Sequence, residues 1–477
     1  MKKYDIAVIG GGVVGCEIAR RMTARNQSVV LIEKEADVAS FGATKANSGI
    51  VHAGFDCKVG TLKAKLNVEG SEMYPALCKR LSVELDTCGA LVVGRKGDED
   101  KIQHLFFQGV ANGVKNLEII GSEQIAQYIK NPNPEITCAL HAGSSAVVSP
   151  YHIAIAMAEE AVLNGCDVLC ESEVFTIQKN SDSFTIFAGE NTVKAKIIIN
   201  ACGANAEKIN KIVGAEAFNA TFARGEYMLL DLSEKDIVSA TIFPLPTKLG
   251  KGVLCSPTAH GNIILGPTAI ACDGDDTVVT QEGLAYIKQN LSQMVDGVNL
   301  RKNIRVFSGV RTVVGDDFII EKSKTVENYL YLGGICSPGL SSAPAIAKYV
   351  EELLSGICEF KDKENQILRT PYTITSNMTD SELDALIKQN PAYGEIVCRC
   401  EKITRGEIIE AINSPLKPRT IDGIKRRVRA GMGRCQGGFC MPSVMEIIEN
   451  ETGMPQEKIT KFGVGSEILQ GGDSDEL

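Results

Sequence analysis

The stretch YDIAVIGGGVVGCEIARRM, residues 4–22, decides the fold that we expect for this chain. A short apolar run rich in β-branched residues is followed by a glycine cluster and then by a helix-like segment. In such a unit Gly10 permits the turn, Gly12 lets the backbone approach a pyrophosphate, and Gly15 lets the helix pack on the strand. The helix-like segment CEIARRMTARN follows Gly15 with its N-terminus towards the anion, and Val13 of the loop is placed among the cofactor contacts. The stretch therefore predicts a dinucleotide-binding α/β unit.

The second expected strand ends in an acid. SVVLIE, residues 28–33, ends at Glu33, whose carboxylate can accept the two hydroxyls of a ribose and disfavours a 2′-phosphate. We place Lys34, the next residue, in the same nucleotide site. A glycine motif alone is weak evidence, but strand, loop, helix, strand and terminal acid together are specific. Both FAD and NAD bind to such units, so this part of the chain does not choose between them.

Three later segments make that choice. They are a small-residue loop, SFGATKANSGIVHAG (40–54), a strand with a Cys-Gly turn, VKAKIIINACGANA (193–206), and a strand with a glycine pair and a helix start, YLYLGGICSPGLSSAPAIAKYV (329–350). In this order they resemble the D-amino-acid oxidase superfamily, in which they build an FAD site. Nicotinamide enzymes lack the third segment.

The resemblance implies an α/β fold with a Rossmann-like FAD-binding domain and a set of cofactor contacts. Gly333 and Gly334 would lie near the pyrophosphate, Val174 would meet the adenine, and the start of the last helix would face the flavin pyrimidine. A helix packing site and a plain core valine are the alternatives. The remaining implied contacts are Ala43, Thr44, Asn47, Ser48, Gly49, Cys202, Gly203, Gly339, Leu340 and Ser341.

His52 is the candidate catalytic base, because its loop is expected to pass the isoalloxazine. Oxidation of an alcohol by flavin transfers a hydride while a base accepts the hydroxyl proton, and the ordinary pKa of histidine suits this role. The alternative is a histidine that only hydrogen-bonds the flavin or the backbone. His260, in SPTAHGNIILGPT, is a second candidate near the substrate. The other three histidines are interpreted as structural.

Arg311 is the candidate anchor for a substrate anion. It lies in the apolar stretch FSGVRTVV, where an unpaired guanidinium is costly unless an anion meets it. By resemblance it would orient the substrate over the flavin; a salt bridge with Asp316 or Asp317 is the alternative. The stretch FARGEYMLLD, residues 222–231, resembles the strand that roofs the pocket. Tyr227 and Arg224 would bind substrate there or belong to ordinary sheet surface.

Four of the sixteen cysteines are grouped near the C-terminus. Cys398 and Cys400 form one close pair, Cys435 and Cys440 the other, and thiolates so placed can hold a metal centre. The CxC opening and the GRCQGGFC close resemble the [2Fe-2S] domain of the bacterioferritin-associated ferredoxin type. Zinc and a redox disulfide are the alternatives.

Basic residues fill the segment between the cysteine pairs. Within residues 415–435 only Asp422 is acidic, so this segment reverses the charge of the chain. The cations would offset an anionic cluster and attract an acidic redox partner, or they are solvated helix surface. They are Lys417, Arg419, Lys425, Arg426, Arg427, Arg429 and Arg434.

The composition of the chain limits the partners and the cellular location that we expect for this protein. A net charge of −9 argues against nucleic acid as a main partner. Residues 328–347 carry no charge, but prolines and repeated Gly and Ser make a membrane-spanning helix a poor interpretation. Many cysteines without an export signal favour a reducing compartment. We expect a cytoplasmic protein without a transmembrane segment, peripheral to the membrane at most through a partner.

The FAD-binding pieces are discontinuous, so we expect a substrate domain inserted between them. Residues 1–85, 146–215 and 312–358 would form the FAD-binding domain. Residues 86–145 and 216–311 would form an antiparallel-sheet substrate domain that covers the flavin. A linker (359–391), a small α-helical [2Fe-2S] module (392–455, here the cysteine module) and a tail (456–477) complete the chain.

The whole sequence resembles two families most: the anaerobic glycerol-3-phosphate dehydrogenase large subunit and L-2-hydroxyglutarate oxidase-like proteins. Both imply a small anionic secondary alcohol as substrate. We favour glycerol 3-phosphate, because an iron-sulfur module implies that electrons leave through protein, with a second flavoprotein subunit, a similar acceptor or a quinone receiving them. A 2-hydroxy acid enzyme, a peroxide-forming oxidase and an electron-transfer subunit without its own alcohol substrate are the alternatives.

Overall fold

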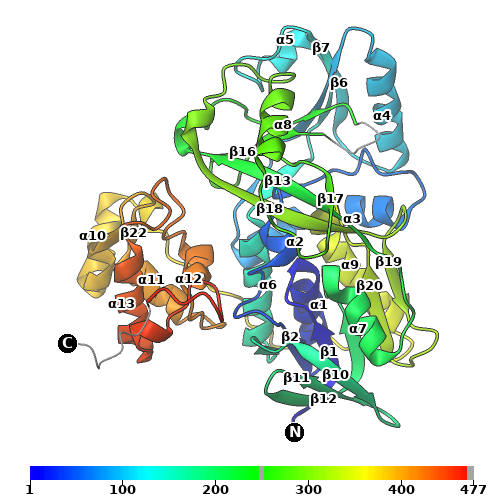
Figure 1. Ribbon diagram of the computed structural model, residues 1–477, viewed down its shortest axis with the longest axis vertical. Coiled ribbons are helices and arrows are strands. Elements are labelled where there is room, and N and C mark those ends of the chain that lie inside the picture. Colours follow the sequence, from blue (N-terminus) through cyan, green and yellow to red (C-terminus); the bar gives the residue numbers. More distant parts are fainter. Residues whose placement is uncertain (247–251, 470–477) are drawn as a thin grey trace.

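The computed structural model describes residues 1–246 and 252–469, and two large sheets dominate it (Figure 1). The strand order of the first sheet is β10-β11-β12-β1-β2-β9, with β20 paired to β12 and β19 paired to β20. At its centre β1 pairs in parallel with β12 on one side and with β2 on the other. Its strands are β1 (Lys3–Ile9), β2 (Val29–Ile32), β9 (Asp167–Leu169), β10 (Val174–Lys179), β11 (Phe184–Ala188), β12 (Asn191–Asn200), β19 (Ile319–Lys322) and β20 (Tyr329–Gly333).

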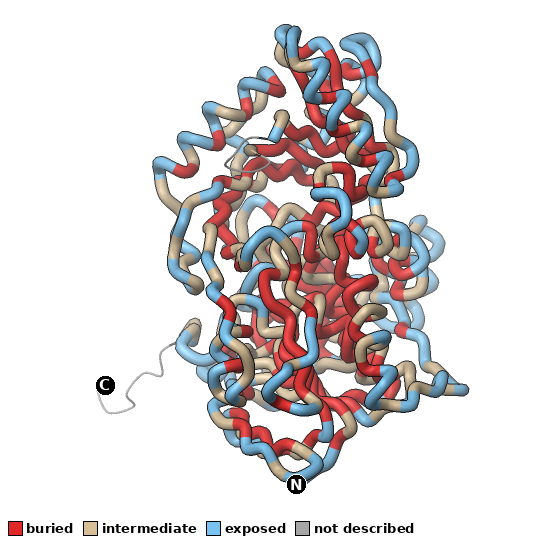
Figure 2. The backbone as a smooth tube through the Cα atoms, turned by 90° about the vertical axis from the view of Figure 1, so that its right-hand side faces the viewer, coloured by how far each residue is buried: buried red, intermediate tan, exposed pale blue. Residues whose placement is uncertain are grey.

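Alternate residues of β1 enter different cores, as the side-chain period of a strand requires. Ile6 and Val8 pack with four helices on one face, whereas Ala7 and Ile9 pack on the other face with α7 (Ala206–Val213). The four helices are α1 (Val13–Ala24), α3 (Leu62–Leu81), α6 (Pro150–Leu163) and α9 (Gly339–Leu354). Buried segments run continuously through the centre of the molecule (Figure 2).

The second sheet has the order β17-β13-β16-β15-β14-β5-β7-β6, with β18 on β13, and is antiparallel except between β5 and β14. Three helices belong to this half, α4 (Glu99–Ala111), α5 (Ser122–Ile125) and α8 (Gln281–Leu291). Its strands are β5 (Ala90–Arg95), β6 (Leu117–Gly121), β7 (Ile136–Ala142), β13 (Thr221–Leu230), β14 (Thr241–Pro244), β15 (Leu254–Pro257), β16 (Ile263–Gly266), β17 (Ile270–Cys272) and β18 (Asn303–Val313).

A third, small sheet consists of β3 (Ile50–Val51), β8 (Ala146–Val148) and β4 (Leu85–Asp86), with β8 in the middle. One further short helix, α2 (Gly42–Lys45), contacts β18 of the second sheet. The α/β class and the antiparallel second sheet expected from the sequence are confirmed.

The C-terminal part is mostly helical. It contains α10 (Asp380–Gln389), the two-stranded sheet of β21 (Ile396–Cys398) and β22 (Ile403–Thr404), and the helices α11 (Arg405–Ile412), α12 (Ile421–Val428) and α13 (Met441–Thr452) around their own apolar core. In Figure 1 this part lies to the side of the two sheets, with α12 nearest to them. Residues 470–477 of the expected tail lie outside the described residues. In the described part of the chain, every helix is too short or too polar to cross a bilayer.

Candidate active site and metal centre

The glycine loop after β1 and the first turn of α1 have no room for a larger residue at Gly10 or at Gly15. Gly10 adopts φ +108°, and a Cβ there would lie 2.6 Å from the Ala201 carbonyl oxygen. A Cβ on Gly15 would lie 1.9 Å from the Gly10 carbonyl oxygen. The loop therefore passes directly over the start of α1, whose free N–H groups point out of the helix end.

The acid at the end of β2 is tied to this loop. Glu33 accepts hydrogen bonds from the N–H of Gly11 (2.6 Å) and of Glu35 (2.9 Å), so its carboxylate is held in one orientation. Burial raises the pKa of Glu33, while the two N–H groups oppose that shift. At the helix start, the Val13 N–H donates to Thr44 Oγ1 at 2.9 Å, which brings α2 onto α1.

A cavity of about 1360 Å³ begins at this loop and extends to the second sheet. Most of the expected cofactor contacts line it: Gly10, Gly12, Val13, Glu33, Lys34, Ala43, Thr44, Asn47, Ser48, Gly49, Cys202, Gly203, Gly339 and Leu340. Val174 lines a smaller adjoining pocket of about 80 Å³, together with Gly10 and Glu33. The N-terminus of α9 lines the same large cavity, so the positive end of that helix faces it.

Besides Val174, four of the expected contacts do not line the large cavity. Gly15 packs on Gly10, and Gly333 and Gly334 pack closely against Phe218 and Val314, because β20 runs between covering segments at that point. Ser341 is fully buried in α9, where its hydroxyl accepts the N–H of His52 at 2.7 Å. These positions shape the walls around the cavity.

Two histidines line the cavity, His52 and His260. The His52 ring lies 5.6 Å from the Phe243 ring and is 7% exposed. Burial lowers the pKa of His260 well below its ordinary value, assisted by the positive charge of Arg429. His260 is therefore neutral at physiological pH and can accept a hydrogen bond.

The three remaining histidines lie outside the cavity lining. His104 is exposed on α4, and His141 Nδ1 lies 2.7 Å from Glu118 Oε1. Burial and three nearby arginines lower the pKa of His152 to about 3.

Arg311 on β18 lines the same cavity as the glycine loop. One terminal nitrogen donates to the Thr268 carbonyl, and its buried Nε has no partner among the described residues. The acid once considered as its partner, Asp317, instead accepts the N–H groups of Leu62 (2.7 Å) and Lys63 (2.8 Å) at the start of α3. The guanidinium thus retains donors for an anion.

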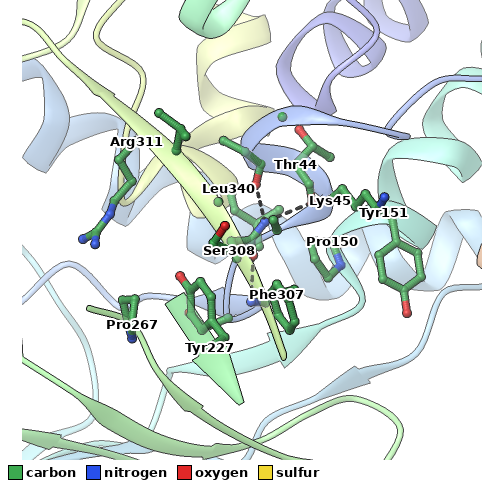
Figure 3. A pocket seen from close by; sticks show the side chains of 18 of the residues that line it. Thr44, Lys45, Pro150, Tyr151, Tyr227, Pro267, Phe307, Ser308, Arg311 and Leu340 are labelled. Atoms are coloured by element: carbon green, nitrogen blue, oxygen red, sulfur yellow. Dashed lines mark hydrogen bonds between the residues drawn. The ribbon is translucent and has the colours of Figure 1, made fainter. Parts of the chain in front are cut away.

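Tyr227 and Phe307 form an aromatic wall beside Arg311 (Figure 3). Their rings are stacked, with centroids 5.0 Å apart and planes at 15°. The two residues come from the adjacent strands β13 and β18, which pair at this position. Burial raises the pKa of Tyr227, so its hydroxyl stays protonated and can donate.

Arg224 differs from the expectation. It is buried, it pairs with Asp276 and, at 3.4 Å, with Glu226, and it does not line the cavity. The reason is the alternation of side chains along β13: positions 224 and 227 face opposite sides, so only one of them can face the substrate. Arg224 therefore stabilises the sheet and does not contact the cavity.

The four grouped cysteines form two thiol pairs. Cys400 Sγ lies 3.6 Å from Cys435 Sγ, and Cys440 donates a hydrogen bond to Cys398. This bond lowers the pKa of Cys398 to about 6, and N–H groups of Gly437 and Phe439 hold the pKa of Cys435 below its usual value against the effect of burial. Among the described residues, no set of three or more ligand side chains converges on one point where a single ion could sit.

The basic segment is only partly solvent-exposed. Arg426 and Arg427 are buried and bind Asp37 in the loop after β2, a partner that lies 389 and 390 residues away in sequence. Sequence reasoning missed this carboxylate, and no local pattern marks it. It also missed that Lys45, Arg305, Met432 and Gln436 line the cavity.

Comparison with known proteins decides what this arrangement is. Residues 5–353 match the family model "FAD dependent oxidoreductase", and residues 396–450 match the model "BFD-like [2Fe-2S] binding domain". The chain belongs to the FAD dependent oxidoreductase family. It binds FAD, and its C-terminal domain carries a [2Fe-2S] cluster. The resemblances stated from the sequence are confirmed.

Among the relatives of this FAD dependent oxidoreductase, "Glycerol 3-phosphate dehydrogenase" from Caloramator mitchellensis is 41% identical over 99% of this chain and all of its own length. "L-2-hydroxyglutarate dehydrogenase, mitochondrial" from Homo sapiens is 30% identical over 56% of this chain and 61% of its own. The structure of an L-alpha-glycerophosphate oxidase from Mycoplasma pneumoniae with FAD bound has a TM-score of 0.73 and 28% identity, covering 77% of this chain and 98% of that one.

The residues of this oxidoreductase fit both cofactors, FAD and the [2Fe-2S] cluster. Gly10–Gly12 with the α1 N-terminus can hold a pyrophosphate, Glu33 a ribose, and the start of α9 the anionic side of a flavin. In a [2Fe-2S] cluster held by four cysteines each iron takes two thiolates, which two thiol pairs provide, whereas a structural zinc needs all four around one ion.

Proposed function

We propose that this chain is an FAD-dependent dehydrogenase that oxidises sn-glycerol 3-phosphate to dihydroxyacetone phosphate and passes the electrons through its [2Fe-2S] cluster to a protein acceptor. One observation carries the proposal. A single cavity joins the glycine loop, His52 and Arg311, whose donors are not used up by carboxylates among the described residues. That combination suits a small anionic alcohol held next to a flavin.

Each group then has a separate role. The guanidinium of Arg311 binds the phosphate in a fork geometry, and Tyr227 with Phe307 shields the carbon chain from water. His52 accepts the hydroxyl proton as the carbinol hydrogen leaves with its electron pair. Bound FAD supplies the acceptor for that hydride. His260, neutral and in the same cavity, orients the second hydroxyl of the substrate.

We choose between the two substrate classes by how much of this chain each relative aligns with. The glycerol 3-phosphate dehydrogenase aligns with 99% of this chain, including the cysteine module, whereas the L-2-hydroxyglutarate dehydrogenase aligns with 56%. Arg311 itself serves a phosphate or a carboxylate equally well. L-2-hydroxyglutarate is therefore the competing substrate in the test.

The electron acceptor would bind at the exposed edge of the cysteine module. Phe439, between Gly438 and the ligand Cys440, is 87% exposed, and Cys400 is exposed as well. A bare aromatic side chain next to a redox centre is a good anchor for a protein partner. We propose an acceptor protein, such as a second flavoprotein subunit, and a cytoplasmic location for the pair.

The test is an anaerobic titration of the holoenzyme followed at the flavin absorption band. Glycerol 3-phosphate should bleach the band stoichiometrically, and L-2-hydroxyglutarate should not. If only L-2-hydroxyglutarate bleaches the band, then L-2-hydroxyglutarate is the substrate. If only a reduced protein bleaches it, the chain is an electron-transfer subunit without its own alcohol substrate. Rapid oxygen consumption with substrate alone would make it an oxidase.

A further inference from the structure

The cysteine module forms one wall of the cavity that holds the flavin and substrate sites. Six of its residues line the cavity: Asp422, Lys425, Arg426, Arg429, Met432 and Gln436. They come from α12 and from the loop after it, which contains Cys435. The module is therefore part of the site, in agreement with its place beside α2 and α6 in Figure 1.

A buried ion pair fixes the module in that position. Asp37, 3% exposed, accepts Arg427 through both carboxylate oxygens (2.8 and 3.1 Å) and Arg426 at 2.7 Å. Burial alone would raise the pKa of Asp37, but the two guanidinium groups outweigh it and hold the pKa below its usual value. The carboxylate is thus charged at neutral pH and bound on two sides.

A second contact supports the first. Glu159 on α6 accepts the Tyr372 hydroxyl and Arg369 Nε, and lies 3.6 Å from Arg427 Nε. Arg369 and Tyr372 belong to the segment that leads into the module. Both docking carboxylates therefore belong to elements that flank the first sheet.

The loop held in this way connects the cavity to the cysteines. Gln436, next to Cys435, lines the cavity and accepts a hydrogen bond from Arg305 of β18 at 3.1 Å. Met432 lines it too, with its sulfur 3.4 Å from the Tyr151 hydroxyl. Arg429 binds Glu401, the residue after Cys400, at 2.8 Å. Short links thus run from the cavity wall to the residues next to Cys435 and Cys400, the two members of one thiol pair.

We propose that Asp37 is a positioning residue for electron transfer: by docking the cysteine module against the cavity, it makes the flavin of this chain the direct electron donor to the cluster of the same chain. The inference rests on the proposed function. Asp37 touches neither substrate nor cluster ligands. Its effect is exerted through Arg426 and Arg427.

The number of electrons released by the substrate determines how many transfers must take place between the flavin and the docked cluster. Each alcohol oxidised to a ketone releases two electrons and two protons. A [2Fe-2S] cluster takes up one electron at a time, so each turnover needs two successive transfers across the docked contact. The acceptor protein removes each electron from the cluster, and the protons go to solvent.

The experiment is anaerobic stopped-flow mixing of holoenzyme with glycerol 3-phosphate, recorded separately at the flavin band and at the cluster band. In Asp37→Asn, flavin reduction at saturating glycerol 3-phosphate should keep its wild-type rate, whereas cluster reduction should slow by about tenfold or more, because a buried charge left without its partner strongly disfavours the docked state. Asp37→Glu, which keeps the charge, should recover much of the cluster rate. Glu395→Gln, which breaks an exposed ion pair with Arg405 inside the module, is the matched control and should change neither rate.

An unchanged cluster rate in Asp37→Asn, with flavin and iron content equal to wild type, would overturn the inference and leave the proposed function intact. Flavin that glycerol 3-phosphate cannot reduce in the wild-type enzyme would overturn the proposed function instead. If Asp37→Asn does not fold, Tyr372→Phe removes one hydroxyl from the second docking contact. This variant should slow cluster reduction and leave flavin reduction unchanged. If both rates in this variant equal those of the wild type, the inference is also overturned.

Discussion

The N–H of His52 donates a hydrogen bond of 2.7 Å to Oγ of Ser341, which lies 289 residues further along the chain. The bond fastens the loop that carries His52 to the first turn of α9. The positive end of α9 and the His52 ring consequently line the same cavity. One contact thereby holds together the residue that we propose as the base and the helix end that we propose as the stabiliser of negative charge.

Replacement of His52 by alanine should slow flavin reduction by glycerol 3-phosphate by about 100-fold or more, since the hydroxyl proton then lacks a positioned acceptor. The measurement is the anaerobic rate at the flavin band under saturating substrate. His104→Ala, on an exposed face of α4, serves as the control. A near-normal rate in the His52 variant would remove the residue from the role of base.

Replacement of Arg311 by alanine should raise the Kd for glycerol 3-phosphate by a factor of about 30 or more, corresponding to a loss of roughly 2 kcal/mol or more for a charge-assisted fork. Equilibrium titration of the oxidised enzyme with the product dihydroxyacetone phosphate measures the same contact without turnover. Arg224→Ala is the informative contrast. It breaks a buried ion pair outside the cavity, so it should lower the unfolding temperature and leave the affinity unchanged.

The pH dependence of substrate binding should reflect two lysines at the end of the cavity made by α2 and α12. Burial lowers the pKa of both Lys45 and Lys425 to about 8, with Arg305 nearby. A lysine is charged below its pKa and neutral above it, so this end of the cavity loses positive charge as the pH rises from 7 to 9. KM for glycerol 3-phosphate should rise over that range.

The double variant Lys45→Met/Lys425→Met tests the origin of that effect. It should have a raised KM already at pH 7 and little further change up to pH 9. If the double variant kept the wild-type pH profile, these lysines would not attract the substrate, and the titrating group would lie elsewhere.

Local patterns were sufficient to predict the cofactor loop. The requirement for glycine at Gly10 and Gly15 and for an acid at Glu33 arises within a short strand-turn-helix unit, so the sequence itself displays it. The same level of reasoning bears on the two alternatives given for Arg224, pocket or sheet surface. Two residues three positions apart on a strand cannot share a face, which left a choice between Arg224 and Tyr227.

Docking of the cysteine module was not predictable in this way. Asp37 and Arg427 are separated by 390 residues, and neither has a neighbour that announces the pair. Arg427 stands in a run of cations that resembles solvated helix surface, but its side chain is fully buried. Only the tertiary arrangement shows which of the basic residues meet the buried Asp37.

Electron delivery to the acceptor should depend on Phe439. Phe439→Ser should lower the rate of reduction of the acceptor protein by about tenfold, as for the loss of an aromatic anchor of a partner contact, while flavin and cluster reduction by substrate stay normal. Phe107→Ser, at a residue 59% exposed on α4, is the matched control. Equal acceptor rates in wild type and the Phe439 variant would place the partner on another face.

A single cysteine substitution should remove the cluster and leave the flavin site functional. Cys435→Ser removes one thiolate from the pair with Cys400, so that one iron loses half of its protein ligands and the cluster should not assemble. Iron content and the cluster's visible absorption would measure its loss. Flavin content and anaerobic bleaching by glycerol 3-phosphate should persist, because Cys435 does not line the cavity. Cys272→Ser, at a partly exposed cysteine in β17, controls for the general effect of losing a thiol. A full iron content in Cys435→Ser would show that the four cysteines are not the ligand set.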